Sequence, residues 1–311
     1  MSRLVKSINN PRKAIKVFWG LFLKRVAPYI KNDERYIRLK WWSTMDYSLN
    51  LKNPKTFNEK IQWLKLHDRN PEYIKMVDKV EAKKYVASII GEEYIIPTIG
   101  VYEKVDDIDF EKLPKQFVLK CTHDSNGVVI CKDKSTFDIK KAKTKLERGL
   151  AQSYYCYNRE WPYKGVKPRI IAEKFMTDDE NGAELKDYKW FCFDGTPKYL
   201  FIATDRFTDG KQTKFDFYDT SFKHLPFTNG HPNASKAIKK PAGFEKMKEI
   251  SACLSQGLPH VRVDLYDIKG KIYFGELTFY HWSGFMPFKP QEWDYKFGEL
   301  ITLPQNPHNN D

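Results

Sequence analysis

The segment 262–278 places the tightest constraint on the fold, because it has the pattern of a charged β-hairpin. Polar and apolar residues alternate on both sides of a short polar run that ends in Gly270, which is typical of two antiparallel strands. A three-residue loop formed by Ile268, Lys269 and Gly270, with the glycine at positive φ, predicts that Asp267 faces Lys271 across the hairpin.

This register brings charged side chains together on one face of the hairpin. Arg262 would lie directly opposite Glu276, and Asp264 would be a diagonal neighbour on the same face. Two carboxylates close to a guanidinium suit a metal–nucleotide, because Mg²⁺ binds a few carboxylate oxygens together with substrate phosphates. The alternative is an ordinary salt-bridged hairpin, since cross-strand ion pairs are common.

The composition indicates a globular protein with an anionic partner. The 311 residues, 41% of them hydrophobic, are enough for one large or two modest domains. A net charge of +13 fits nucleic acid, nucleotides, acidic polysaccharide or an anionic membrane face. Five scattered cysteines without a CxxC pair argue against a disulfide framework or a zinc site.

Residues 1–40 form a predicted basic, amphipathic N-terminal arm. Between residues 11 and 29, aromatic and aliphatic side chains mix with five Lys and Arg. Such a helix could lie on an anionic membrane surface, so peripheral membrane contact through residues 11–29 is one prediction. The alternative, favoured by the broad apolar arc, is a helix packed on the domain or on a second subunit.

The sequence predicts a cytoplasmic protein, with peripheral attachment to the inner face of the membrane as an option. The N-terminal apolar run is short and is followed by Lys24 and Arg25, which is unlike a cleavable signal peptide. Nothing approaches the roughly 18 apolar residues of a membrane span.

The remaining segments predict an α+β fold, because strands and helices mix without strict βαβ alternation. Thr56 and Glu59 form a capping box at the start of one helix, and a second helix runs from Asp78 towards Gly91. Other helices are expected over 135–150 and 244–254, and extended segments over 94–102, 116–121, 128–131, 169–176, 188–193 and 197–203.

A candidate phosphate loop follows the strand that ends in Lys120. Small polar residues, including Ser125 and Asn126, precede Gly127. They would let backbone N–H groups approach a phosphate, while the lysine adds a point charge. The spacing is not that of a Walker loop. The alternative is a surface hairpin with a solvated lysine.

In their order along the chain, these segments resemble the ATP-grasp fold from about residue 78 to residue 284. Asp78–Lys83 resembles the family's DKxxxK helix, and Phe117–Lys120 resembles its VVKP strand. The resemblance implies that Lys83 and Lys120 contact nucleotide phosphate, ahead of the loop with Ser125, Asn126 and Gly127 that folds over the triphosphate.

The second half of the resemblance concerns the adenine and metal sites. Residues 171–176 resemble the VEExI hinge, so Glu173, Lys174, Phe175 and Met176 would bind adenine. Asp187 would hold the ribose hydroxyls. Arg262 and Asp264, with Glu276 and Thr278, resemble the RxD…ExN pair. This implies that Asp264, Glu276 and Thr278 bind Mg²⁺ and that Arg262 is catalytic.

The chain is most similar to the TupA-like branch of this family, named for teichuronopeptide synthesis. The run 53–63 and the segment 276–284 carry that similarity, whereas Thr278 replaces the usual asparagine and Cys121 stands where proline is common. The resemblance implies two α+β subdomains that grip the nucleotide, with boundaries at 1–40 (arm), 41–115 (helical region), 116–186 (lid), 187–303 (metal and substrate subdomain) and 304–311 (polar tail).

The implied function is an ATP-dependent carboxylate–amine ligase that forms an acyl-phosphate. Its partners would be an acidic glycan or sugar nucleotide and an amine donor in bacterial surface polysaccharide biosynthesis. The alternatives are a glycosyltransferase of the same pathway, a sugar kinase on the same fold and a non-enzymatic protein that binds nucleic acid or membranes through its charge. No RNA- or DNA-binding motif is visible, so nucleic acid is not expected as a partner.

Overall fold

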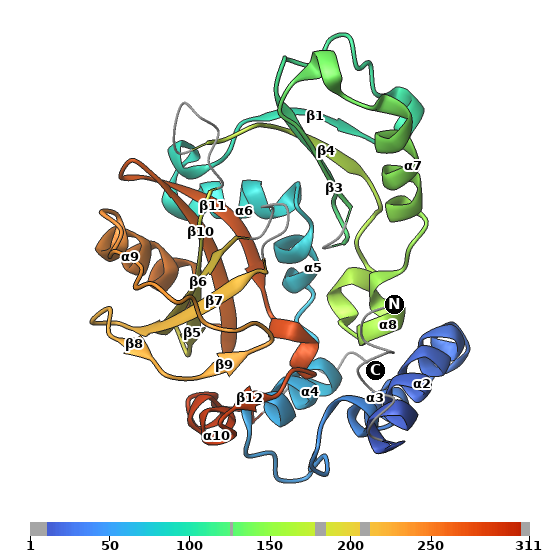
Figure 1. Cartoon of the computed structure of the whole chain (residues 1–311), viewed down its shortest axis with the longest axis vertical. Coiled ribbons are helices and arrows are strands. Elements are labelled where there is room, and N and C mark those ends of the chain that lie inside the picture. Colours follow the sequence, from blue (N-terminus) through green and yellow to red (C-terminus); the bar gives the residue numbers. More distant parts are fainter. Residues whose placement is uncertain (1–10, 125–126, 178–184, 206–211, 306–311) are drawn as a thin grey trace.

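The computed structural model describes residues 11–124, 127–177, 185–205 and 212–305. Within them, two antiparallel sheets lie at the centre of two lobes (Figure 1). The mixture of helices and sheets confirms the predicted α+β class.

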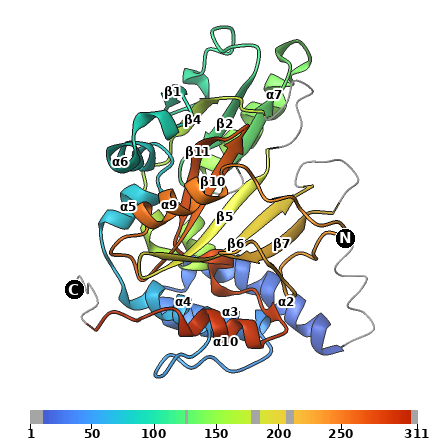
Figure 2. The same cartoon turned by 90° about the vertical axis from the view of Figure 1, so that its left-hand side faces the viewer.

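The larger sheet has six strands in the order β11-β10-β5-β6-β7-β8. Its bounds are β5 Asp187–Phe193, β6 Thr196–Thr204, β7 Lys214–Asp219, β8 His224–Leu225, β10 His260–Ile268 and β11 Lys271–Thr278. A small pair, β9 Thr228–Asn229 and β12 Phe288–Lys289, lies beside it. The large hydrophobic core surrounds this sheet, which is packed by helices α9 Phe244–Leu254, α4 Phe57–His67 and α10 Glu292–Glu299. Helices α4 and α10 lie at the end of the molecule opposite the smaller sheet (Figure 2).

The smaller sheet has the order β1-β4-β2-β3 and its own core under α7 Ile139–Leu150. Its strands are β1 Thr98–Tyr102, β2 Phe117–Cys121, β3 Val128–Cys131 and β4 Ile170–Lys174. The subdomain boundary at residue 116 stays a prediction. Strand β1, from the segment 41–115, pairs with β4 in this sheet.

The predicted register of the β10–β11 hairpin is wrong by one residue. Lys269 and Gly270 form a two-residue turn, both at positive φ (53° and 86°), and Ile268 pairs with Lys271. Such a turn matches the right-handed twist of the strands better than a three-residue loop does. Consequently Asp267 pairs with Ile272 instead of Lys271.

Nearer the site, a β-bulge changes the register again, so that the charged residues of β10 and β11 share one face of the hairpin. The register shifts after Asp264, so that Gly275 is the extra residue on β11. Asp264 therefore lies opposite Glu276, and Arg262 lies opposite Thr278. Arg262 and Glu276, predicted to lie directly opposite each other, are therefore diagonal neighbours. Asp264, predicted to be a diagonal neighbour, lies directly opposite Glu276.

Helix α4 begins as the sequence predicts. Thr56 accepts a hydrogen bond from the backbone N–H of Glu59, and the Glu59 carboxylate accepts one from the backbone of Thr56. The short helix α5 Glu72–Val77 was not expected, and helix α6 spans Glu81–Ile90, three residues later than the sequence suggests. Asp78 ends α5 instead, and its Oδ1 accepts from the backbone N–H groups of Val80 and Glu81.

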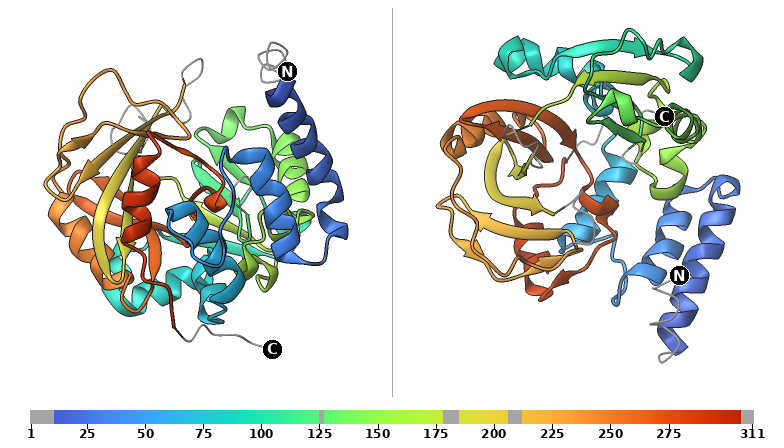
Figure 3. Two further views of the ribbon diagram at one scale, coloured as in Figure 1. Left: turned by 90° about the horizontal axis from the view of Figure 1, so that it is seen from below. Right: turned by 45° about the horizontal axis from the view of Figure 1, so that its top comes forward.

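The N-terminal arm is a helical hairpin at the edge of the molecule. Helix α2 Pro11–Val26 packs against α3 Asp33–Thr44, and Figure 3 shows α2 on the outer side of this pair. The short helix α8 Tyr154–Asn158 lies near the turn between them. The inner face of α2 therefore packs on the protein, which is the alternative that the sequence favoured for this arm.

Candidate functional site

Arg262, on β10, is the centre of a buried charge cluster. Its Nε donates to Asp264 Oδ1 at 2.6 Å, and its Nη2 donates to Asp264 Oδ2 at 2.7 Å. The same Nη2 contacts Glu276 Oε1 at 3.1 Å and Thr278 Oγ1 at 3.0 Å. The structure thus brings together the four residues that the sequence assigned to catalysis and metal binding.

His281 fixes the other end of the guanidinium. Nη1 of Arg262 donates to His281 Nδ1 at 2.8 Å, and His281 Nε2 lies 2.9 Å from Asn229 Oδ1. Burial and the nearby Arg262 charge lower the pKa of His281 well below its usual value, so this imidazole is neutral. It accepts from Arg262 and donates to Asn229, which orients the guanidinium towards the carboxylates.

Lys189 is a second cation at this site that the sequence analysis did not identify. It lies on β5, directly opposite Asp264 on β10, and forms an ion pair with Asp264. Its Nζ is also 3.5 Å from Asp187 Oδ1. The strand pattern showed only that Lys189 shares a face with Asp187; the pairing of β5 with β10 brings it to the metal-binding candidates.

The two carboxylates have different electrostatic environments. Burial raises the pKa of Asp264, although Arg262 and Lys189 act in the opposite direction. Burial also acts to raise the pKa of Glu276, but Lys189 and Arg262 outweigh it and lower that pKa to about 2. The side chain of Glu276 is 41% exposed, so it is the carboxylate that a ligand can reach.

A second charge cluster lies where the smaller sheet faces helix α6. Glu173, on β4, is buried and forms ion pairs with Lys83 from α6 and with Lys120 from β2, the latter at 2.6 Å. Lys83 and Lys120, which the resemblance assigned to phosphate, therefore both pair with one carboxylate. That carboxylate belongs to Glu173, which the resemblance assigned to adenine. Burial opposes ionisation of Glu173, yet Lys120 and Lys83 lower its pKa to about 2.

The two clusters are close enough to influence each other. Burial acts to lower the pKa of Lys120, but the charge of Glu173, with smaller contributions from Glu276 and Asp187, raises it. Together the two clusters hold both cations and carboxylates, which suits a polyanionic ligand with bound cations.

The family assignment rests on sequence comparison. A family model described as TupA-like ATPgrasp matches residues 59–302. This chain belongs to the TupA-like ATP-grasp family. The family match supports an ATP-dependent ligase activity. No curated protein matches the chain significantly.

Several solved ligase structures are similar to this chain, all at low identity and low TM-score. D-alanine–D-alanine ligase from Helicobacter pylori is 14% identical, with 79% of this chain and 69% of that chain covered and a TM-score of 0.43. The corresponding ligase from Bacillus anthracis, complexed with ATP, is 18% identical, with 65% and 54% covered and a TM-score of 0.38. Phosphoribosylamine–glycine ligase from Thermotoga maritima is 16% identical, with 68% and 49% covered and a TM-score of 0.39. The chain spans about half the length of the latter two.

Within the TupA-like site, Lys79 is a further cation that the sequence analysis did not assign a role. It is the first lysine of the DKxxxK segment, and its Nζ donates to the backbone oxygen of Asp124 at the start of the candidate phosphate loop. Burial lowers its pKa, and the charge of Glu276 acts against that shift. The charge of Glu276 thus acts on Lys79, whereas Lys83 forms its ion pair with Glu173.

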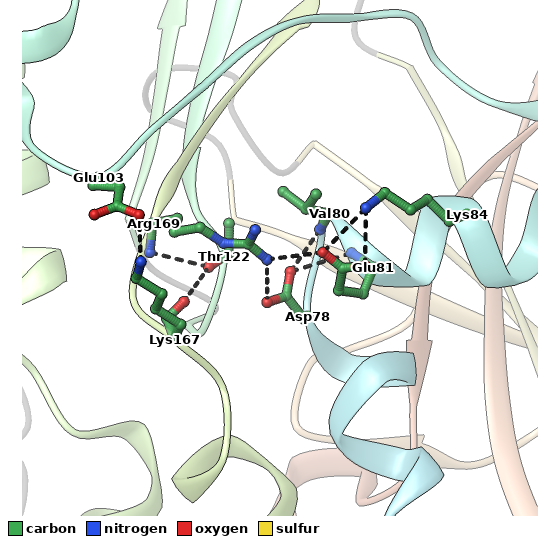
Figure 4. A network of polar contacts seen from close by, with 8 residues as sticks. All are labelled: Asp78, Val80, Glu81, Lys84, Glu103, Thr122, Lys167 and Arg169. Carbon is green, nitrogen blue, oxygen red and sulfur yellow. Dashed lines mark hydrogen bonds and ion pairs between the residues drawn. The ribbon is translucent and has the colours of Figure 1, made fainter.

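A polar network joins the DKxxxK segment to the smaller sheet (Figure 4). Arg169, next to β4, donates to Asp78 Oδ2 at 2.8 Å and to Glu81 Oε1 at 3.3 Å. Asp78 Oδ1 accepts from the backbone N–H of Val80, the residue just before α6, at 2.8 Å. The network fixes where α6 begins and thereby positions Lys79 and Lys83.

The candidate phosphate loop is partly described. Ser125 and Asn126 lie outside the described residues. Gly127 donates its backbone N–H to Asp124 Oδ1 at 3.0 Å, and its carbonyl accepts from the backbone of Cys121. A side chain at Gly127 would overlap Asp124 and Cys121, so glycine is required for this close approach.

The predicted adenine hinge forms the end of β4 and the residues after it. Lys174 is exposed, and its backbone N–H donates to Pro97 at 3.0 Å. Phe175 and Met176 are half-buried. Contact of these residues with adenine stays a prediction, as does the ribose role of Asp187.

The residues on β10 and β11 fit a divalent cation. Asp264 and Glu276 both bind the same nitrogen of Arg262, so their oxygens converge within reach of one ion. Among the described residues, no group of three or more His, Cys, Asp or Glu side chains is arranged as a metal site. Two carboxylates with the Thr278 hydroxyl would leave the other positions for phosphate oxygens and water, which is how Mg²⁺ is usually bound.

Proposed function

We propose that this TupA-like protein joins a carboxylate to an amine at the expense of ATP, through an acyl-phosphate. The observation that carries the proposal is the convergence of Asp264, Glu276 and Thr278 on one buried guanidinium, in a site that Lys79 and Lys189 also enter. Such a site neutralises several negative charges at once.

In the first step, an oxygen of the substrate carboxylate attacks the γ-phosphorus of ATP and ADP leaves. Two anions must approach each other, so the barrier is largely electrostatic. Arg262, held by His281, and the lysines Lys79 and Lys120 would place positive charge around the transferring phosphoryl group. Asp264 and Glu276 would hold Mg²⁺, which would supply further charge stabilisation.

In the second step, the nitrogen of the amine attacks the acyl carbon, phosphate leaves and the nitrogen loses a proton. Water competes with the amine for the acyl-phosphate, so a site closed over its substrates favours amide formation. The loop that contains Gly127 connects two strands of the smaller sheet and would provide that cover.

The proposed substrate is the carboxylate of a uronic acid, or of an amino-acid component, in bacterial surface polysaccharide biosynthesis. The acidic acceptor could be a glycan or a sugar nucleotide, and the second substrate is an amine donor. The family resemblance and the net charge of +13 support an acidic substrate. We place the reaction in the cytoplasm, where ATP is available.

The test combines ligand-dependent thermal stability with phosphate release. A ligand that binds the native protein raises the melting temperature by mass action. We expect a rise with Mg²⁺–ATP but not with Mg²⁺–UDP-sugars, and its loss in Asp264→Asn and Glu276→Gln. Carboxylate–amine pairs that stimulate phosphate release in the wild type would identify the substrates.

The controls separate loss of binding from loss of fold. Glu276 is partly exposed, so Glu276→Gln should still unfold cooperatively without ligand, at a melting temperature only moderately below that of the wild type. Glu249→Gln, at an exposed ion pair on α9, should retain both the ATP response and turnover. Full activity of Glu276→Gln would contradict the metal assignment, and a response to UDP-sugars alone would favour a glycosyltransferase.

A further inference from the structure

Helix α2 presents an apolar face to solvent. Ile15, Phe18, Leu21 and Phe22 have exposed fractions of 58%, 73%, 57% and 48%. Their spacing of three and four residues places them on one side of the helix. An exposed stripe of this size is unusual on a soluble protein and marks a contact surface. We call these four residues the α2 face.

The opposite side of α2 already provides its packing on the protein. Leu23 is buried, the Trp19 ring contacts Trp42 of α3 with centroids 6.0 Å apart, and Lys16 pairs with Asp46 at 2.8 Å. The α2 face is therefore not needed to attach the helix to the domain. The family match begins at residue 59, so this hairpin also lies outside the matched ligase region.

Basic residues surround the α2 face. The segment 11–44 contains nine Lys and Arg but only two Asp and Glu. Two of the basic residues, Lys16 and Lys40, are turned inward. Six others are exposed: Arg12, Lys24, Arg25, Lys31, Arg35 and Arg38. An apolar stripe with cationic flanks is the pattern of a helix that lies in a membrane interface.

Aromatic side chains extend the surface from α2 to α3. A groove of about 760 Å³ between the two helices is lined by Trp19, Leu39 and Trp42, with Arg35 and Arg38 at its side. Tyr29, at the turn after α2, is 83% exposed. Tryptophan and tyrosine are favoured at the headgroup level of a bilayer, because their rings are apolar and their polar atoms can reach water.

We propose that the α2 face docks on an anionic lipid bilayer, with α2 parallel to the membrane plane. The apolar side chains would enter the headgroup boundary, and the surrounding cations would contact lipid phosphates. Among the described residues, no helix is long and apolar enough to cross a membrane. Contact through the surface of α2 is consistent with that finding.

Charge favours a bilayer over a second copy of this chain. A symmetric dimer through the α2 face would bring the same patch of each copy together. Exposed cations such as Arg25 and Lys24 would then face cations of the second copy, and like charges repel each other. An anionic leaflet attracts the same cations. This inference does not depend on the proposed ligase reaction, since it uses none of the site residues.

The test is flotation of the full-length protein with lipid vesicles. We expect binding to phosphatidylcholine vesicles that contain one quarter phosphatidylglycerol at about 0.1 M salt, and weaker binding at high salt because exposed charges are screened. Phe18→Asp should lower the partition coefficient about tenfold or more, because an exposed phenyl ring would no longer be buried in lipid. Arg25→Glu should lower it about fivefold or more.

The matched control is Ile89→Asp, on helix α6, where the side chain is 43% exposed. This variant should bind vesicles like the wild type. Both aspartate variants should unfold cooperatively at the melting temperature of the wild type, which shows that they fold. Equal binding of wild type and Phe18→Asp, or no preference for anionic vesicles, would overturn the proposal. Light scattering completes the test: a dimer that Phe18→Asp dissociates, without lipid binding, would assign the α2 face to self-association instead.

Discussion

Glu173 offers the most informative single perturbation, because it is the only acid that ion-pairs with Lys83 and Lys120 in the described part of the chain. The substitution Glu173→Gln keeps the shape of the side chain and removes its charge. Two lysines on different elements, α6 and β2, would then lie close together without their shared counter-ion. Like charges in a buried position are strongly unfavourable.

The size of the effect follows from the pKa shift. Lys120 and Lys83 overcome burial and lower the pKa of Glu173 from 4.5 to about 2. Since one pKa unit corresponds to about 1.4 kcal/mol, the charged form of Glu173 contributes ~3 kcal/mol to folding near neutral pH. Breaking a buried pair by removing one partner typically costs a similar 3–5 kcal/mol or so. We therefore expect Glu173→Gln to lower the free energy of unfolding by about 3 kcal/mol.

The pH dependence gives an independent check. The folded pKa of Glu173 lies below the unfolded one, so its contribution is fully present above the unfolded pKa of 4.5 and is lost as the pH falls towards about 2. The stability difference between wild type and Glu173→Gln should be constant from about pH 7 to about pH 5 and should shrink at more acidic pH.

Thermal denaturation followed by circular dichroism measures the effect. A loss of ~3 kcal/mol corresponds to a melting temperature lower by roughly 5 °C in a protein of this size. The control is Glu103→Gln, whose carboxylate pairs with Lys167 at an exposed position; it should melt like the wild type. A Glu173→Gln variant as stable as the control, or a difference that persists undiminished in acid, would refute the role of Glu173 as the counter-ion of both lysines.

Two further substitutions test the site and the packing beneath it. Lys189→Met should lower kcat/KM for phosphate release roughly tenfold, because Asp264 loses one of its two cationic partners and a buried charged hydrogen bond is worth about that factor; a change in melting temperature alone, with normal kinetics, would contradict this. Gly298→Ala should destabilise the protein by about 1–3 kcal/mol, because its Cβ would overlap the backbone oxygen of Lys55 where α10 packs on α4. In the same denaturation assay Gly20→Ala, in a helix with open space around it, should be neutral or stabilising.

Local sequence patterns predicted most elements, whereas the family resemblance supplied most of the candidate site residues. The capping box of Thr56 and Glu59, the hairpin at Gly270 and the helix over 244–254 depend on residues close together in the chain. Turn chemistry and periodicity describe such local structure directly. The family resemblance added the order of the charged segments, and the match over residues 59–302 confirmed the family.

Long-range pairing determined what the patterns could not. Lys189 joins the metal-binding candidates because β5 lies beside β10, and no local pattern specifies which strands become neighbours. The extra residue at Gly275 shifts the register of the hairpin by one position, because a bulge interrupts the alternation on which the prediction relied.

By itself, the sequence determined the α+β class, the segments that carry charge and the residues that form the candidate site. Only the tertiary structure decided that Glu173 lies between Lys83 and Lys120 and that one side of α2 stays exposed. The physical reason is that side-chain periodicity records which residues share a face of their own element. Which charges and surfaces that face then meets depends on how distant elements pack.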